Sequence, residues 1–209
     1  MIFYDCATAP SPRRARIFIA EKGLDIETRE ISIAEGAQLA PEFLQVNPRA
    51  TVPVLVTDEG TVITENLGIA AYLEAAHPEP PLMGRTPDEK GLVMMWTAII
   101  EQQGFMAIAE ALRNSSPRMK DRALPGPQNY AQIPELAERG KARLGQFYGM
   151  MNDHLAESPF VAGEAFSLAD ITLLVAVDFA RVIRMPVPED HAALTGWHQR
   201  MRERPSAAL

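Results

Sequence analysis

Apolar and polar residues follow a regular order from the start of the chain. Residues 2–5 form a short apolar run, residues 12–22 carry apolar side chains at helical spacing up to Gly23, and residues 26–32 follow that glycine as a second short segment between Ile26 and Ile31. Helical spacing that stops at a glycine is typical of a helix, and short segments on either side of such a helix are typical of strands. The chain therefore begins with a predicted strand, helix and strand.

The same kind of pattern continues to residue 76. The elements that it predicts are a short helix over 41–46, a strand from Val54, a hairpin turn at 58–60, a returning strand around Val62 and a helix opening at 64–66. This order matches a thioredoxin fold. We therefore expect residues 1–76 to form an α/β thioredoxin-like N-terminal domain.

A proline-rich segment separates this pattern from a second one. Residues 77–87 contain four prolines and show no periodicity, so we interpret them as a stiff linker. Apolar positions after the linker follow helical spacing, which predicts an all-α C-terminal helical domain over residues 88–209. Its expected helices span 88–114, 131–156, 167–184 and 189–203.

Composition argues against several classes of function. A net charge of −7 disfavours nucleic-acid binding. No basic segment with a long apolar run precedes the first strand, so we expect a cytoplasmic protein. The most apolar stretch, residues 168–183, contains charges that are costly in lipid, so we expect no membrane partner. The four histidines are scattered and Cys6 is the single cysteine, which argues against a metal site or a disulfide.

Pro53 lies in the run Thr51–Leu55, the most informative segment of the chain. Proline cannot donate to a sheet ladder, so it belongs at the start of a strand, and cis X-Pro bonds concentrate in turns. We expect a cis Val52–Pro53 bond. The backbone of Val52 would then be free to pair with an extended peptide, as a peptide adds to a sheet edge. This segment predicts a short peptide as ligand.

Glu65 and Asn66 lie at the predicted start of the following helix. The free N–H groups of a helix start carry positive dipole charge and attract a carboxylate. Asparagine can cap a helix and can donate from its amide. Taken singly, these residues are typical of ordinary helix starts. Together with Pro53 they predict a peptide-binding segment beside a carboxylate-binding one.

Val52–Pro53 followed by Glu65–Asn66 resembles the glutathione transferases, in which a V-P pair bonds the cysteinyl backbone of glutathione and an E-S pair holds its γ-glutamyl end. A second motif, GxxFSLADI at residues 163–171, resembles the helix start of that family's C-terminal domain, with Ser167 and Asp170 at capping-box spacing. The resemblance implies a homodimeric cytosolic enzyme. Its co-substrate would be glutathione, with no other cofactor, and its second substrate a small electrophilic, largely apolar molecule.

The resemblance also implies further contacts. Gln38 takes the place of the residue that meets the glycyl carboxylate of glutathione, and Arg49 is the alternative. The second-substrate pocket is expected between the two domains. Its expected lining residues are Phe105, Met106, Ile108, Ala109, Leu112 and Tyr130. Because these residues stand at helical spacing, they fit the core of a helical domain equally well.

Ser11 is the candidate catalytic residue, and two interpretations of it are open. A thiol becomes a nucleophile when a hydrogen-bond donor or positive charge lowers its pKa. Ser11 precedes Pro12 at the predicted start of the first helix, so it is either the direct donor to the thiolate or a helix N-cap. When the chain is aligned with plant-type transferases at Arg14, their serine corresponds to Ala9. Matched at Gly23, Ser11 coincides with the reactive cysteine of beta-type enzymes.

Residues 4–23 as a whole look closest to a bacterial and fungal subgroup that lacks the standard Tyr, Ser or Cys. In that subgroup activation falls to backbone N–H groups, the helix start or a water molecule, so we expect Ser11 to act as an N-cap. Two rival functions are a glutathione-dependent thiol oxidoreductase or peroxidase that uses Cys6 or a mixed disulfide, and a non-catalytic glutathione-binding carrier. A lone cysteine at a strand end is most often a small buried apolar residue.

Overall fold

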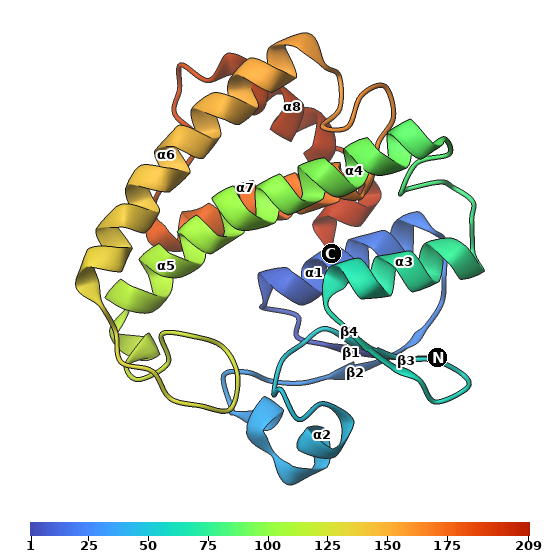
Figure 1. Ribbon diagram of the computed structural model, residues 1–209, viewed down its shortest axis with the longest axis vertical. Helices are drawn as coiled ribbons and strands as arrows, with labels where there is room; N and C mark the ends of the chain where they lie inside the picture. The colour runs from blue at the N-terminus through green and yellow to red at the C-terminus, as the bar shows by residue number, and fades with distance from the viewer. The chain divides into compact units, whose positions relative to one another are not determined.

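Residues 1–209 are described by a computed structural model, and they divide into two compact units. The first unit contains Met1–Pro80, Pro125–Gln128 and Leu209, and the second contains Pro81–Leu124 and Asn129–Ala208. The first unit is thioredoxin-like and the second is helical, which confirms the predicted fold class (Figure 1).

A four-stranded mixed sheet forms the centre of the first unit. Its strands are β1 (Ile2–Asp5), β2 (Glu27–Glu30), β3 (Val54–Val56) and β4 (Val62–Thr64), in the spatial order β2-β1-β3-β4. β1 is parallel to β2 and antiparallel to β3, and β3 and β4 form the expected hairpin. Both sides of β3 are therefore paired. Val52 precedes a central strand, so the comparison with a sheet edge is wrong.

Helices cover both faces of this sheet. They are α1 (Pro10–Glu21), the 3₁₀ turn η1 (Ala37–Leu39), α2 (Pro41–Val46) and α3 (Asn66–Ala76). α1 and α3 pack side by side on one face, and α2 lies on the other (Figure 1). The side chains of Tyr4, Cys6, Phe43, Val52 and Val54 form one buried cluster. Proline opens both α1 and α2, where its fixed φ and missing N–H are tolerated.

The second unit consists of helices. They are α4 (Pro87–Ile99), η2 (Ile100–Phe105), α5 (Met106–Ser115), η3 (Pro117–Met119), α6 (Pro134–Glu157), α7 (Leu168–Phe179), η4 (Ala180–Ile183), α8 (Ala192–Arg202) and η5 (Pro205–Ala208). α5 packs on α6, and α4 packs on α7. The run Pro87–Ser115 is long and apolar enough to cross a membrane by length and composition alone, a test that core helices of soluble proteins also pass.

The predicted helix over 88–114 is continuous but contains a π-helical turn, η2. The π turn lies close to α6 because residue 104 is a glycine. A Cβ at this position would stand only 2.9 Å from ring carbons of Phe147. The Arg143 guanidinium of α6 donates to the Gln102 carbonyl of the π turn at 2.6 Å. Periodicity does not reveal such a turn, because the close contact with α6 is tertiary. π turns are frequent at functional sites.

Candidate functional site

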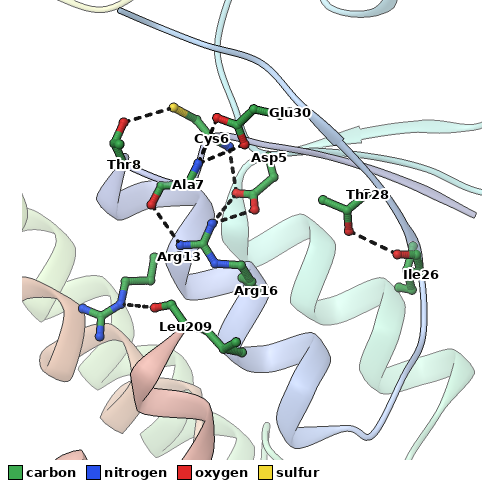
Figure 2. Close-up of polar contacts among 10 residues, drawn as sticks. All are labelled: Asp5, Cys6, Ala7, Thr8, Arg13, Arg16, Ile26, Thr28, Glu30 and Leu209. Carbon is green, nitrogen blue, oxygen red and sulfur yellow. Dashed lines mark hydrogen bonds and ion pairs between the residues drawn. The ribbon is translucent and has the colours of Figure 1, made fainter.

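Charged side chains hold the loop between β1 and α1 (Figure 2). The buried Asp5 carboxylate accepts from the Cys6 N–H at 2.7 Å and pairs with the Arg16 guanidinium at 2.6 Å. The Glu30 carboxylate accepts from the Ala7 N–H at 3.1 Å, and Arg16 donates to the Ala7 carbonyl at 3.3 Å. These contacts fix the chain that leads into α1. No sequence motif marks the three charged residues, because Glu30 reaches the loop through the pairing of β2 with β1 and Arg16 reaches it from α1.

Few backbone donors remain at the start of α1. The N–H groups of Cys6 and Ala7 already bond to carboxylates, and that of Ala9 donates to the Cys6 carbonyl at 3.0 Å. Pro10 and Pro12 lie in the first turn and have no N–H to offer. Activation of a thiol by several backbone N–H groups of this helix start therefore has little support.

Ser11 is the second residue of α1, and Ala9 is the N-cap. The N-cap interpretation of Ser11 is therefore wrong, because Pro10 occupies the first helical position. The Ser11 Oγ instead accepts hydrogen bonds from the Asn66 Nδ2 at 2.8 Å and from the Arg14 guanidinium at 3.4 Å. A hydroxyl has two acceptor positions and one proton. Both acceptor positions of Ser11 are filled, and its proton is left to donate.

The Val52–Pro53 bond is cis, as the sequence predicts. The Asn47 amide holds the preceding segment, donating to the Thr51 carbonyl at 2.8 Å and to its hydroxyl at 3.1 Å. The Val52 side chain is buried, whereas its backbone N–H and C=O form no hydrogen bond within the chain. Asn47 thus positions the Val52 backbone. Its role follows from the fold, although an Asn-Pro pair before a strand is a turn signal.

Glu65 and Asn66 mark the start of α3. Glu65 is the N-cap, with a φ of 66° and a side chain that is 67% exposed. Such a φ is uncommon for residues other than glycine. Residues that adopt it cluster at ligand-binding and active sites. The Arg49 guanidinium lies 3.9 Å from the Glu65 carboxylate and hydrogen-bonds the Thr64 hydroxyl. Asn66 is only 5% exposed, and its Oδ1 is buried without a partner.

Gln38 lies in η1 and is 9% exposed. Its Oε1 is buried and has no hydrogen-bond partner. Buried polar atoms are rarely unpaired, so each exception needs an explanation such as a ligand. Arg49, the alternative to Gln38 in the sequence, lies beside Glu65. Because the unpaired Gln38 oxygen can only accept, a carboxylate would have to be bound by the Gln38 amide nitrogen instead.

The expected lining residues of the second-substrate pocket differ in burial. Ile108 has no exposed surface, so it is a core residue of the second unit and its assignment to a pocket is wrong. Met106 is 49% exposed. Phe105 and Leu112 are partly buried, and the Phe105 ring stacks on Phe179 with the centroids 6.3 Å apart.

Cys6 is 1% exposed and belongs to the buried cluster on the sheet. Its Sγ lies 3.6 Å from the Thr8 hydroxyl. A thiol with so little exposed surface behaves as a small apolar side chain. Its environment is that of a core residue and does not favour thiol exchange.

Comparison with known proteins identifies related chains over the full length. Residues 8–76 match the model of the glutathione S-transferase N-terminal domain, and residues 106–205 match that of the C-terminal domain. Glutathione S-transferase 2 of Saccharomyces cerevisiae is 37% identical over 99% of this chain and 87% of that protein. Disulfide-bond oxidoreductase YfcG of Escherichia coli is 25% identical over 96% of this chain and 89% of that protein.

A solved structure agrees with these sequence matches. The crystal structure of Gtt2 from Saccharomyces cerevisiae superposes with a TM-score of 0.91 and 34% identity, covering 100% of this chain and 99% of that one. The thioredoxin-like unit, the helical unit and the cis Val52–Pro53 bond all lie within the matched region. The chain belongs to the glutathione S-transferase family.

Proposed function

We propose that this protein is a glutathione transferase that conjugates glutathione to small electrophilic, largely apolar molecules. Its full-length relationship to Glutathione S-transferase 2 supports this function. Glutathione is the co-substrate, and the proposal requires no metal or other cofactor. The unpaired backbone groups of Val52 and the unpaired Oδ1 of Asn66 are available for polar contacts with a tripeptide.

In this proposal each part of glutathione has its own contact. The Val52 backbone, next to Pro53, pairs with the cysteinyl residue. Glu65 and Asn66 at the start of α3 take the γ-glutamyl end, and the Gln38 amide nitrogen donates to the glycyl carboxylate. The electrophile contacts the accessible apolar side chains of Phe105, Met106 and Leu112.

The Ser11 hydroxyl is the direct donor to the thiolate. The observation that carries this proposal is that both acceptor positions of its Oγ are filled by Asn66 and Arg14, so that the proton must be donated elsewhere. A hydrogen bond to the thiolate favours the charged form and lowers the pKa of the thiol. The thiol proton leaves to solvent. The thiolate then forms a C–S bond to the electrophilic carbon while the leaving group departs with its bonding pair.

Ser11→Ala tests this step. We expect the pKa of the enzyme-bound thiol, followed by ultraviolet titration of the thiolate, to rise by about one pH unit or more. Conjugation at neutral pH should fall about tenfold and recover as the pH rises. Thr8→Ala is the matched control, because Thr8 carries the exposed hydroxyl of the same loop. An unchanged pKa in Ser11→Ala would refute the assignment, and a rise in Thr8→Ala would transfer it to Thr8.

A glutathione-dependent disulfide exchange is the second candidate, favoured by the similarity to Disulfide-bond oxidoreductase YfcG. Burial argues against Cys6 as its nucleophile, so the exchanging thiolate would be that of glutathione itself. Mass spectrometry after incubation with oxidised glutathione distinguishes the two routes. A glutathione adduct on Cys6 in the folded protein would restore the cysteine route.

We also propose that the protein is a cytoplasmic homodimer that detoxifies electrophiles. Its resemblance to cytosolic transferases supports the location and the role. For the dimer, α4 exposes Leu92, Met94 and Met95, a group of large apolar side chains on one helix. Light scattering after size exclusion should give twice the mass of 23.0 kDa. A monomeric mass at micromolar concentration would contradict the dimer.

A further inference from the structure

We infer that Asn66 is a positioning residue for catalysis, which fixes the Ser11 hydroxyl as a donor to the glutathione thiolate. This inference rests on the proposed function, because it requires Ser11 to be the donor. Asn66 would then not only bind glutathione but also act on its thiol through Ser11.

The contact joins two helices that are distant in sequence. Ser11 lies in the first turn of α1 and Asn66 is the first residue of α3, and these helices pack side by side. The Asn66 Nδ2 reaches the Ser11 Oγ at 2.8 Å, within the usual range of a hydrogen bond. The Arg14 contact is longer, at 3.4 Å. Asn66 therefore makes the stronger of the two contacts, and Arg14 adds a positive charge.

An amide nitrogen is a donor only, and this property sets the direction of the Ser11 hydroxyl. A hydroxyl rotates to suit its neighbours, and a serine at position 66 could accept the Ser11 proton. Neither the Asn66 amide nitrogen nor the Arg14 guanidinium can do so. With both of them donating to the Oγ, the Ser11 proton must point to a third partner.

This arrangement explains two departures from the family motifs together. Ala9 stands at the serine position of plant-type transferases, and Asn66 stands at the serine position of the E-S pair. A donor at Ser11, one helical position beyond Pro10, needs a neighbour that will not compete for its proton. Asn66 meets that condition through its amide nitrogen, which lies on the Ser11 Oγ, and its burial at 5% exposure keeps the amide in place.

Asn66→Asp is the most direct test, because it keeps the shape of the side chain and replaces the donor by an acceptor. The Ser11 proton would then turn to the introduced carboxylate. We expect the pKa of the bound thiol to rise by about one pH unit or more, with kcat at neutral pH reduced about tenfold and recovering at higher pH. Asn66→Ala, which removes the contact without adding charge, should raise the pKa in the same direction by less.

Glu65→Gln is the matched control, since Glu65 adjoins Asn66 but makes no contact with Ser11. It should raise KM for glutathione and leave the pKa of the bound thiol unchanged. All titrations are made at saturating glutathione, so that a loss of affinity cannot be mistaken for a change in the thiol. Circular dichroism of each variant confirms that the fold is retained.

The double variant Ser11→Ala/Asn66→Asp separates a positioning role from a direct charge effect. If Asn66 acts through Ser11, the second substitution adds no further rise in pKa to that of Ser11→Ala. Additive rises would show that the new carboxylate acts on the thiolate through space and would overturn the inference. A normal pKa in both Asn66 variants, with a raised pKa in Ser11→Ala, would also overturn it while leaving the proposed function intact. No rise in Ser11→Ala would remove both.

Discussion

The Asp170 carboxylate at the start of α7 offers a quantitative test of how the second unit is held together. It accepts hydrogen bonds from the Val161 N–H at 2.9 Å, from the N–H and hydroxyl of Ser167 at 3.0 Å each, and from the Trp197 Nε1–H at 3.1 Å. Asp170, Val161 and Trp197 have no exposed surface, and Ser167 is 3% exposed. One carboxylate therefore joins the cap of α7, the loop before it and α8.

Replacing Asp170 by alanine leaves three buried N–H donors without an acceptor, on Val161, Ser167 and Trp197. A buried unsatisfied donor costs about 1–3 kcal/mol, so we expect a loss of roughly 3–5 kcal/mol in the free energy of unfolding. The alanine variant also avoids the free-energy cost of burying a carboxylate. The expected loss is therefore well below the sum of three full penalties for the unsatisfied donors. That cost is visible in the pKa of Asp170, which burial raises to about 6.

Urea unfolding at pH 7 and one fixed protein concentration measures the loss as a shift of the midpoint at constant slope. Asp153→Ala is the control, because Asp153 is an exposed residue of α6 with no hydrogen bond in the structure. We expect it to change the free energy of unfolding by less than about 0.5 kcal/mol. A loss below about 1 kcal/mol in Asp170→Ala would refute the reasoning.

Two further predictions concern pH and packing. Because the folded-state pKa of Asp170 is raised to about 6, its stabilising contribution is fully present below about pH 4 and is lost as the pH rises through about 6. Relative to Asp170→Asn, the wild type should therefore lose about 1 kcal/mol of unfolding free energy per pH unit between about pH 4.5 and 6; a constant difference in urea unfolding would contradict this. Gly104→Ala should lower the unfolding free energy by about 1–3 kcal/mol, because its Cβ would meet the buried Phe147 ring. Gly145→Ala, with open space around its Cβ, should instead raise it by about 0.5–1 kcal/mol; equal thermal midpoints for the two variants would refute the packing argument.

The sequence by itself determined those features that depend on near neighbours in the chain. The order of short strand-like segments and helical spacing predicted a thioredoxin-like unit followed by a helical one. The proline after Val52 predicted the cis bond, and the spacing of Ser167 and Asp170 predicted the capping box at α7, which the structure contains. Each depends on a few consecutive residues, whose backbone preferences and side-chain reach are fixed by local chemistry.

Tertiary structure decided the features that join distant segments. The π turn η2 lies against α6, and the Glu30 contact with the β1–α1 loop follows from the pairing of β1 with β2. Ser11 and Asn66, 55 positions apart, meet because α1 and α3 share one face of the sheet. Local spacing favoured an N-cap at Ser11, but the packing of two helices made it a hydrogen-bond acceptor whose proton remains to be donated.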